Sequence, residues 1–197
     1  MEVIPFPDLA KAPSGPQTPS RWERICRALA LALGVAFIVT LLFAVSLALA
    51  VMFYDGPNLR FGVGGLSLFA GDSPGSVTMD AFSVSQRLVG VALVLLLCAP
   101  AVFILHQARL LAAAFSKGRM FSDDCAQGLR RIAWGFVAYA FAPPLAHGVA
   151  ILVGMTGDPI WLRFEFFGAL LLAALLALLA QANARAGAIE QDRDGFV

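Results

Sequence analysis

Four long apolar runs alternate with shorter polar segments along the whole chain. About 20 apolar residues suffice for a helix to cross a hydrocarbon core of roughly 30 Å, so each run is long enough for one membrane span. The spans are expected at about residues 28–53, 88–109, 132–154 and 166–186. This pattern predicts an all-α integral membrane protein, a four-transmembrane-helix bundle.

The two ends of the chain differ from this membrane domain, which we place at residues 21–190. Residues 1–20 contain five prolines among polar residues and are expected to form a disordered cytoplasmic tail. Residues 191–197 form a short charged C-terminal tail. A cleaved signal peptide is an alternative reading of the first apolar run, because Ala48-Leu49-Ala50 is typical of a cleavage site, but the run is longer than a signal peptide requires.

Several local signals mark where the helices begin, end or change direction. The helical pattern of the second run continues past the span to Phe115, and Gly118 suits the position just after a helix. Ser122 is a suitable N-cap for the third helix, with two aspartates in its first turn. Pro143 and Pro144 lie near the middle of the third span, where they should bend or break the helix.

The segment between the first two spans predicts a β-hairpin. Residues 58–63 alternate polar with apolar, and a second short run at 66–70 follows Gly64-Gly65. Residues 161–166 alternate in the same way, so they are either a third strand or the first turn of the fourth span with an interfacial tryptophan. The first reading predicts a small β cap on the outer face of the bundle.

Composition and charge support a membrane location and give an orientation. Apolar residues make up 59% of the chain and charged residues 14%, a balance unlike that of soluble domains. Eleven of the 14 Lys and Arg residues lie in the N-terminal segment, the segment between spans two and three, and the C-terminal tail. By the positive-inside rule both termini of this multi-pass protein are expected to be cytoplasmic (N-in and C-in).

The sequence contains few residues suited to chemistry. It carries no motif typical of catalysis, and we expect no catalytic, cofactor-binding or metal-binding residues and no enzymatic activity. Cys26 and Cys98 are expected to be apolar fillers, and Cys125 a cytoplasmic thiol. His147 is the intramembrane ionisable residue, one turn past Pro144; it either bonds a carbonyl freed by the prolines or serves transport or pH sensing.

Two short stretches resemble a known family. They are the turn from Phe115 to Asp123 with its continuation to Ala133, and the tail from Ala188 to Asp192. In these residues the chain resembles the DUF 2975 family of four-span bacterial membrane proteins, from which its long proline-rich lead departs. The family has no assigned activity, and its members are often encoded beside small helix-turn-helix regulators. The resemblance therefore implies a regulatory or accessory role.

The expected cytoplasmic face is the candidate docking surface. Its residues are Phe115, Gly118, Phe121, Arg130 and Arg131. Besides the lipid bilayer, they could engage a small cytoplasmic regulator, with no direct nucleic-acid contact; alternatively, the two phenylalanines pack on each other and the cations merely set the topology. A different function, that of a small transporter or transport subunit, would use Pro143, Pro144 and His147. The oligomeric state is left open.

Overall fold

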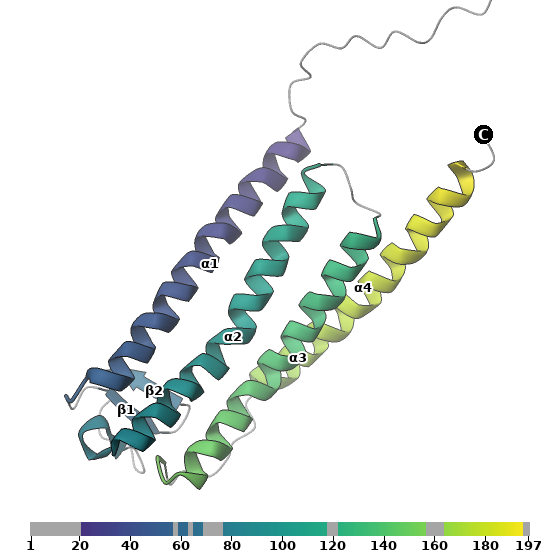
Figure 1. Cartoon of the computed structure of the whole chain (residues 1–197). Coiled ribbons are helices and arrows are strands. Elements are labelled where there is room, and N and C mark those ends of the chain that lie inside the picture. The colour runs from purple at the N-terminus through teal and green to yellow at the C-terminus, as the bar shows by residue number, and fades with distance from the viewer. Residues whose placement is uncertain are drawn as a thin grey trace, which may run out of the picture.

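Four long helices and a small sheet make up the structure, a computed structural model that describes residues 21–56, 59–62, 65–68, 77–117, 122–156 and 164–194 (Figure 1). The helices are α1 (Arg21–Phe53), α2 (Val84–Phe115), α3 (Asp123–Leu152) and α4 (Phe164–Asp194). Between α1 and α2 lie β1 (Leu59–Gly62), β2 (Gly65–Leu68), β3 (Val77–Thr78) and the 3₁₀-helix η1 (Met79–Ala81).

All four helices are long and apolar enough to cross a membrane. Each contains nearly all of its predicted span and continues beyond it, most clearly α2, which runs on to Phe115 as the sequence predicted. The exception is the far end of α3, which stops at Leu152 rather than at residue 154. The apolar runs therefore locate the helices well but underestimate their length, because polar residues continue the helix past the region suited to hydrocarbon.

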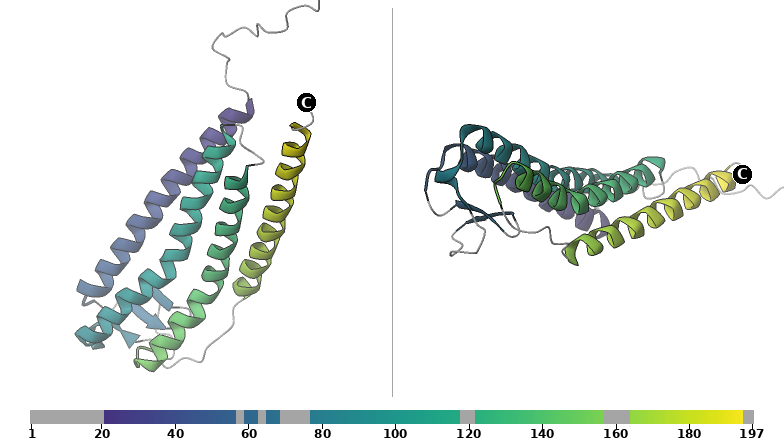
Figure 2. Two further views of the ribbon diagram at one scale, coloured as in Figure 1. Left: turned by 45° about the vertical axis from the view of Figure 1, so that its right-hand side comes forward. Right: turned by 90° about the horizontal axis from the view of Figure 1, so that it is seen from below.

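The helices lie in an open row in which each packs mainly on its sequence neighbours (Figures 1 and 2). The α1–α2 pair shows the antiparallel register: the rings of Phe37 and His106 are 5.6 Å apart, and a Cβ added at Gly90 would meet Val51. We call the end where α1 begins and α4 finishes the terminal end, and the end with the strands the sheet end. An open row leaves more apolar surface outside than a closed bundle does.

The fourth helix is displaced along α3 towards the terminal end. Phe166, near the start of α4, contacts Phe141 in the second half of α3, with ring centroids 5.3 Å apart. Counted from that contact, α4 extends about ten residues beyond the start of α3, or roughly 15 Å along the helix axis. The last turns of α4 therefore project past its only major packing partner (Figure 1).

The sheet end contains the main hydrophobic core of the described residues. Val51, Met79 and Met155 are fully buried there, and Phe82, Leu93 and Val94 pack with them. The strands form an antiparallel sheet in the order β2-β1-β3, with Gly62 opposite Gly65. The predicted hairpin is therefore present. The third strand is Val77–Thr78. Phe164–Phe166 begin α4, so of the two readings of residues 161–166 the first turn of the fourth helix is confirmed for these three residues and the strand is wrong; residues 161–163 lie outside the described part.

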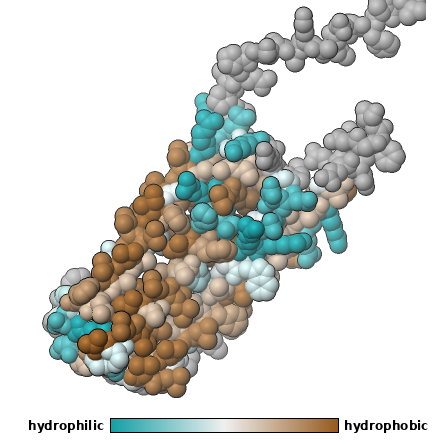
Figure 3. Space-filling model, viewed as in Figure 1, coloured by the Kyte–Doolittle hydropathy of each residue, from teal (hydrophilic) through white to brown (hydrophobic). Residues whose placement is uncertain are grey.

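Hydropathy is unevenly distributed over the surface. In Figure 3 hydrophilic residues gather towards the terminal end, and the face below them is mainly hydrophobic, with a small polar area at the sheet end. Large exposed apolar side chains occur on all four helices, including Leu31, Leu95, Leu145 and Leu171. A contiguous apolar surface of this kind needs an apolar surrounding or a partner.

Candidate functional site

The connection between α2 and α3 was the predicted docking surface, and the structure describes part of it. Gly118 and Phe121 lie outside the described residues. Phe115, the last residue of α2, is half-buried, and Arg130 and Arg131 are both exposed on α3. Consecutive helical residues point about 100° apart, so the two arginines face different directions and do not form one patch.

Local sequence explains how this connection is built. Ser122 caps α3 as predicted, because its side-chain oxygen accepts a hydrogen bond from the backbone N–H of Cys125, with Asp123 and Asp124 in the first turn. Cys125, Ala126 and Leu129 are buried in the first two turns of α3. The thiol of Cys125, with 1% of its residue surface exposed, is therefore not an accessible cytoplasmic group.

Of the bend or break predicted in α3, the break is wrong, because the helix is continuous from Asp123 to Leu152 and contains both prolines. Proline lacks a backbone N–H, so Pro143 and Pro144 cannot donate to the carbonyls one turn earlier. Helices in membranes tolerate this where neighbouring groups or small local adjustments satisfy the freed carbonyls. Pro143 is exposed, while Pro144 and His147 are half-buried. This part of α3 is a helix containing prolines rather than two half-helices around a site.

A polar anchor that the sequence did not reveal lies at the sheet end, around Arg87 in the first turn of α2. The guanidinium of Arg87 donates to the carbonyl oxygen of Met52 at 3.3 Å and to that of Met79 at 2.9 Å, and it pairs with Asp55. One side chain on α2 thus connects the end of α1, the segment after it and η1. Arg87 is 12% exposed and Asp55 is 76% exposed, so the two carbonyl contacts are the sheltered part of the anchor.

Neighbouring residues complete the anchor. Ser83 and Gln86 form a capping box at the start of α2, in which each side chain accepts a hydrogen bond from the other's backbone N–H. The side-chain amide of Gln86 also donates to the carbonyl oxygen of Val153, just after α3, at 3.2 Å. The S-x-x-Q spacing was a detectable signal for the cap, whereas the partners of Arg87 are distant in sequence and gave none.

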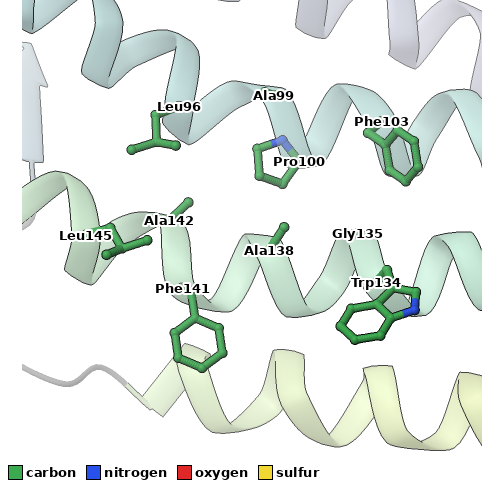
Figure 4. Close-up of a pocket in the computed structure, with 10 residues that line it drawn as sticks. All are labelled: Leu96, Ala99, Pro100, Phe103, Trp134, Gly135, Ala138, Phe141, Ala142 and Leu145. Carbon is green, nitrogen blue, oxygen red and sulfur yellow. The ribbon is translucent and has the colours of Figure 1, made fainter.

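An open groove of about 420 Å³ lies between α2 and α3 on the surface of the protein, along the length of the two helices (Figure 4). Its walls are apolar on both helices: Leu96, Ala99, Pro100 and Phe103 from α2, and Trp134, Gly135, Ala138, Phe141, Ala142 and Leu145 from α3. Helical spacing explains the α3 wall, whose members recur every three or four residues. His147 does not line this groove.

The described residues show no arrangement suited to metal chemistry. Among them there is no group of three or more His, Cys, Asp or Glu side chains that could hold a metal ion. Comparisons of the chain with protein-family models, curated proteins and solved structures give no match. The similarity to the DUF 2975 family therefore stays a prediction from the turn and tail residues.

Proposed function

We propose that the chain is a multi-pass protein of the bacterial inner membrane, with both termini in the cytoplasm, and that it acts as a non-enzymatic regulatory or accessory protein. Its terminal end would be the cytoplasmic face and would dock a small soluble partner. In this orientation the sheet lies over the outer ends of α1 and α2 as the predicted β cap.

The membrane part of this proposal is supported by length, composition and surface distribution. Four apolar helices of sufficient length lie side by side, and the hydrophilic surface is concentrated at the terminal end (Figure 3). Arg21, Arg24, Arg27, Arg130 and Arg131 are exposed on the terminal halves of their helices. Cations in this position favour the cytoplasmic side of a bilayer.

The projecting end of α4 is the observation that carries the docking proposal. It extends roughly 15 Å past the start of α3, counted along the axis from the Phe141–Phe166 contact. Ile189 is 71% exposed on this segment, and Arg185, one turn earlier on the same face, is also exposed. An exposed apolar residue beside a cation, on the part of α4 that extends past the start of α3, is a suitable anchor for a helix of another protein.

The transport alternative has less support from the geometry. It relied on a broken third helix around His147, and α3 is continuous there. The groove between α2 and α3 offers a solute no charged side chain, and the indole N–H of Trp134 is the one polar side-chain group among its lining residues. We therefore retain docking as the proposed function.

Site-specific photocrosslinking in cells tests the docking proposal. A photoreactive amino acid at Ile189 should form an adduct with one soluble protein, and the same amino acid at Leu171, exposed on the apolar part of α4, should not. The captured protein, once purified, should bind the solubilised wild-type chain at least tenfold more tightly than the Ile189→Asp variant, because an apolar anchor of this size contributes about 1.5–3 kcal/mol. Equal binding of the two chains would refute docking at α4.

The orientation is tested separately by thiol labelling of engineered cysteines. In a variant whose native cysteines are replaced by alanine, Val84→Cys at the sheet end should react with a membrane-impermeant maleimide in spheroplasts. Arg24→Cys should react only after permeabilisation. Both native residues are exposed, so access depends on the side of the membrane rather than on burial. The reverse labelling pattern would overturn the N-in and C-in topology.

A further inference from the structure

A cation, the side chain of Arg131, lies just beyond one end of the apolar groove between α2 and α3. On α3, Arg131 is followed by Trp134, Ala138 and Leu145 at intervals that keep them on one face of the helix. Trp134 and Leu145 both line the groove, and Arg131 is exposed one turn beyond Trp134 (Figure 4). From the terminal end, this face of α3 therefore presents first the guanidinium of Arg131, then the indole of Trp134 and then the apolar groove.

This order matches the layers of one leaflet of a bilayer. Arginine suits the phosphate layer, tryptophan is enriched at the interface, and the apolar walls suit hydrocarbon. From Trp134 to Leu145 the groove extends about 16 Å along α3, close to the roughly 15 Å that one leaflet contributes to the hydrocarbon core. Its length and chemistry thus agree with a single lipid lying along the helices.

We propose that the groove holds an acyl chain of an anionic phospholipid from the leaflet at the terminal end, with the lipid phosphate at Arg131. The proposal rests on the membrane insertion proposed above, but it uses a different surface from docking at α4. Charge complementarity selects the occupant: Arg131 is the charged residue nearest the mouth of the groove on this face, and Asp124 lies about 10 Å further towards the terminal end.

The walls also favour a flexible chain over a rigid partner. Ala99, Ala138 and Ala142 keep the middle of the groove open, while Phe103 and Trp134 flank it near the arginine (Figure 4). Trp134 is 72% exposed, so its indole is available to a headgroup or to the ester region of a lipid. A larger side chain at Ala138 should therefore fill the middle of the groove.

Native mass spectrometry of the full-length protein tests this proposal. The protein is purified from detergent containing equal amounts of phosphatidylglycerol and phosphatidylcholine, and retained lipids are counted. Wild type should retain one phosphatidylglycerol in preference to phosphatidylcholine. Arg131→Gln should lower the ratio of the two about fivefold, the fold-change expected for one cation near an anionic surface, and Arg130→Gln, which faces another direction, should leave it unchanged.

A second pair of variants tests the groove itself. Ala138→Phe should reduce retention of both lipids, whereas Ala32→Phe, at an exposed position on α1, should not. Equal retention of the two lipids by wild type, or an unchanged ratio in Arg131→Gln, would overturn the proposal. So would a lipid-free dimer that Ala138→Phe dissociates, because the occupant would then be a second copy. Resistance of every variant to alkaline extraction from membranes shows that insertion holds even when lipid selection fails.

Discussion

Replacement of Arg87 by methionine should remove the anchor at the sheet end while keeping most of the apolar stem. Two hydrogen bonds from the guanidinium to the carbonyls of Met52 and Met79 would be lost, and both carbonyls would remain in a sheltered site. Hydrogen bonds with one charged partner contribute about 1.5–3 kcal/mol each, so the low end of that range for two bonds gives a loss of about 3 kcal/mol. For a chain of this size, such a loss lowers the melting temperature by about 6–12 °C.

The exposed carboxylate of Asp55 provides the matched control. Because Asp55 is 76% exposed, the ion pair is largely screened, and Asp55→Asn should cost less than about 1 kcal/mol. Thermal unfolding of the purified proteins in detergent, followed by circular dichroism, measures both variants. If Asp55→Asn destabilises the protein as much as Arg87→Met, the ion pair rather than the carbonyl contacts dominates. A shift below about 2 °C for Arg87→Met would refute the anchor altogether.

Two other measurements test the packing. A Cβ at Gly90 would lie 2.9 Å from Cγ1 of Val51, so Gly90→Ala should lower the free energy of unfolding by about 1–3 kcal/mol, while Gly148→Ala, with open space around it, should be neutral or slightly stabilising in the same thermal assay. The thiol of Cys125 should react with a maleimide only after denaturation, whereas Gln127→Cys, exposed on the same helix in an otherwise cysteine-free chain, should react at once. Similar reactivity at the two positions would contradict the burial of Cys125.

Elements governed by local sequence were predicted well. The apolar runs predicted all four helices, and Ser122 predicted the start of α3 to within a residue. The hairpin was located near Gly64-Gly65, although Gly65 belongs to β2 and lies opposite Gly62 rather than in the turn. These features depend on helix capping, hydrophobic run length and turn preference, all of which act over a few neighbouring residues. The high apolar content of the sequence likewise agrees with the many exposed apolar side chains of the structure.

Features that depend on distant partners were not predictable. The sequence gives no sign that Arg87 differs from other cations between the apolar runs, because its partners Met52 and Met79 come beside it only in the fold. A two-residue strand such as Val77–Thr78 is too short to show an alternation of polar and apolar residues. The prolines at 143 and 144 suggested a break, because local rules describe an isolated helix in water rather than a helix supported by its neighbours. The groove needed two helices in register before its walls could be recognised. At the docking surface, the sequence indicated that the fourth helix continues past its span, but the displacement of α4 along α3 depends on the packing of the two helices and could not be predicted.

The sequential packing of the helices has a consequence for how the protein is made. The two largest helix–helix interfaces, α1 with α2 and α3 with α4, each join helices that follow one another in the chain, so the principal contacts form between successive helices. Low contact order of this kind favours rapid assembly of successive hairpins during translation. It also makes the α1–α2 pair separable: a chain ending after α2 retains the Arg87 anchor and the sheet, whereas a chain ending after α3 loses the main packing partner of α3.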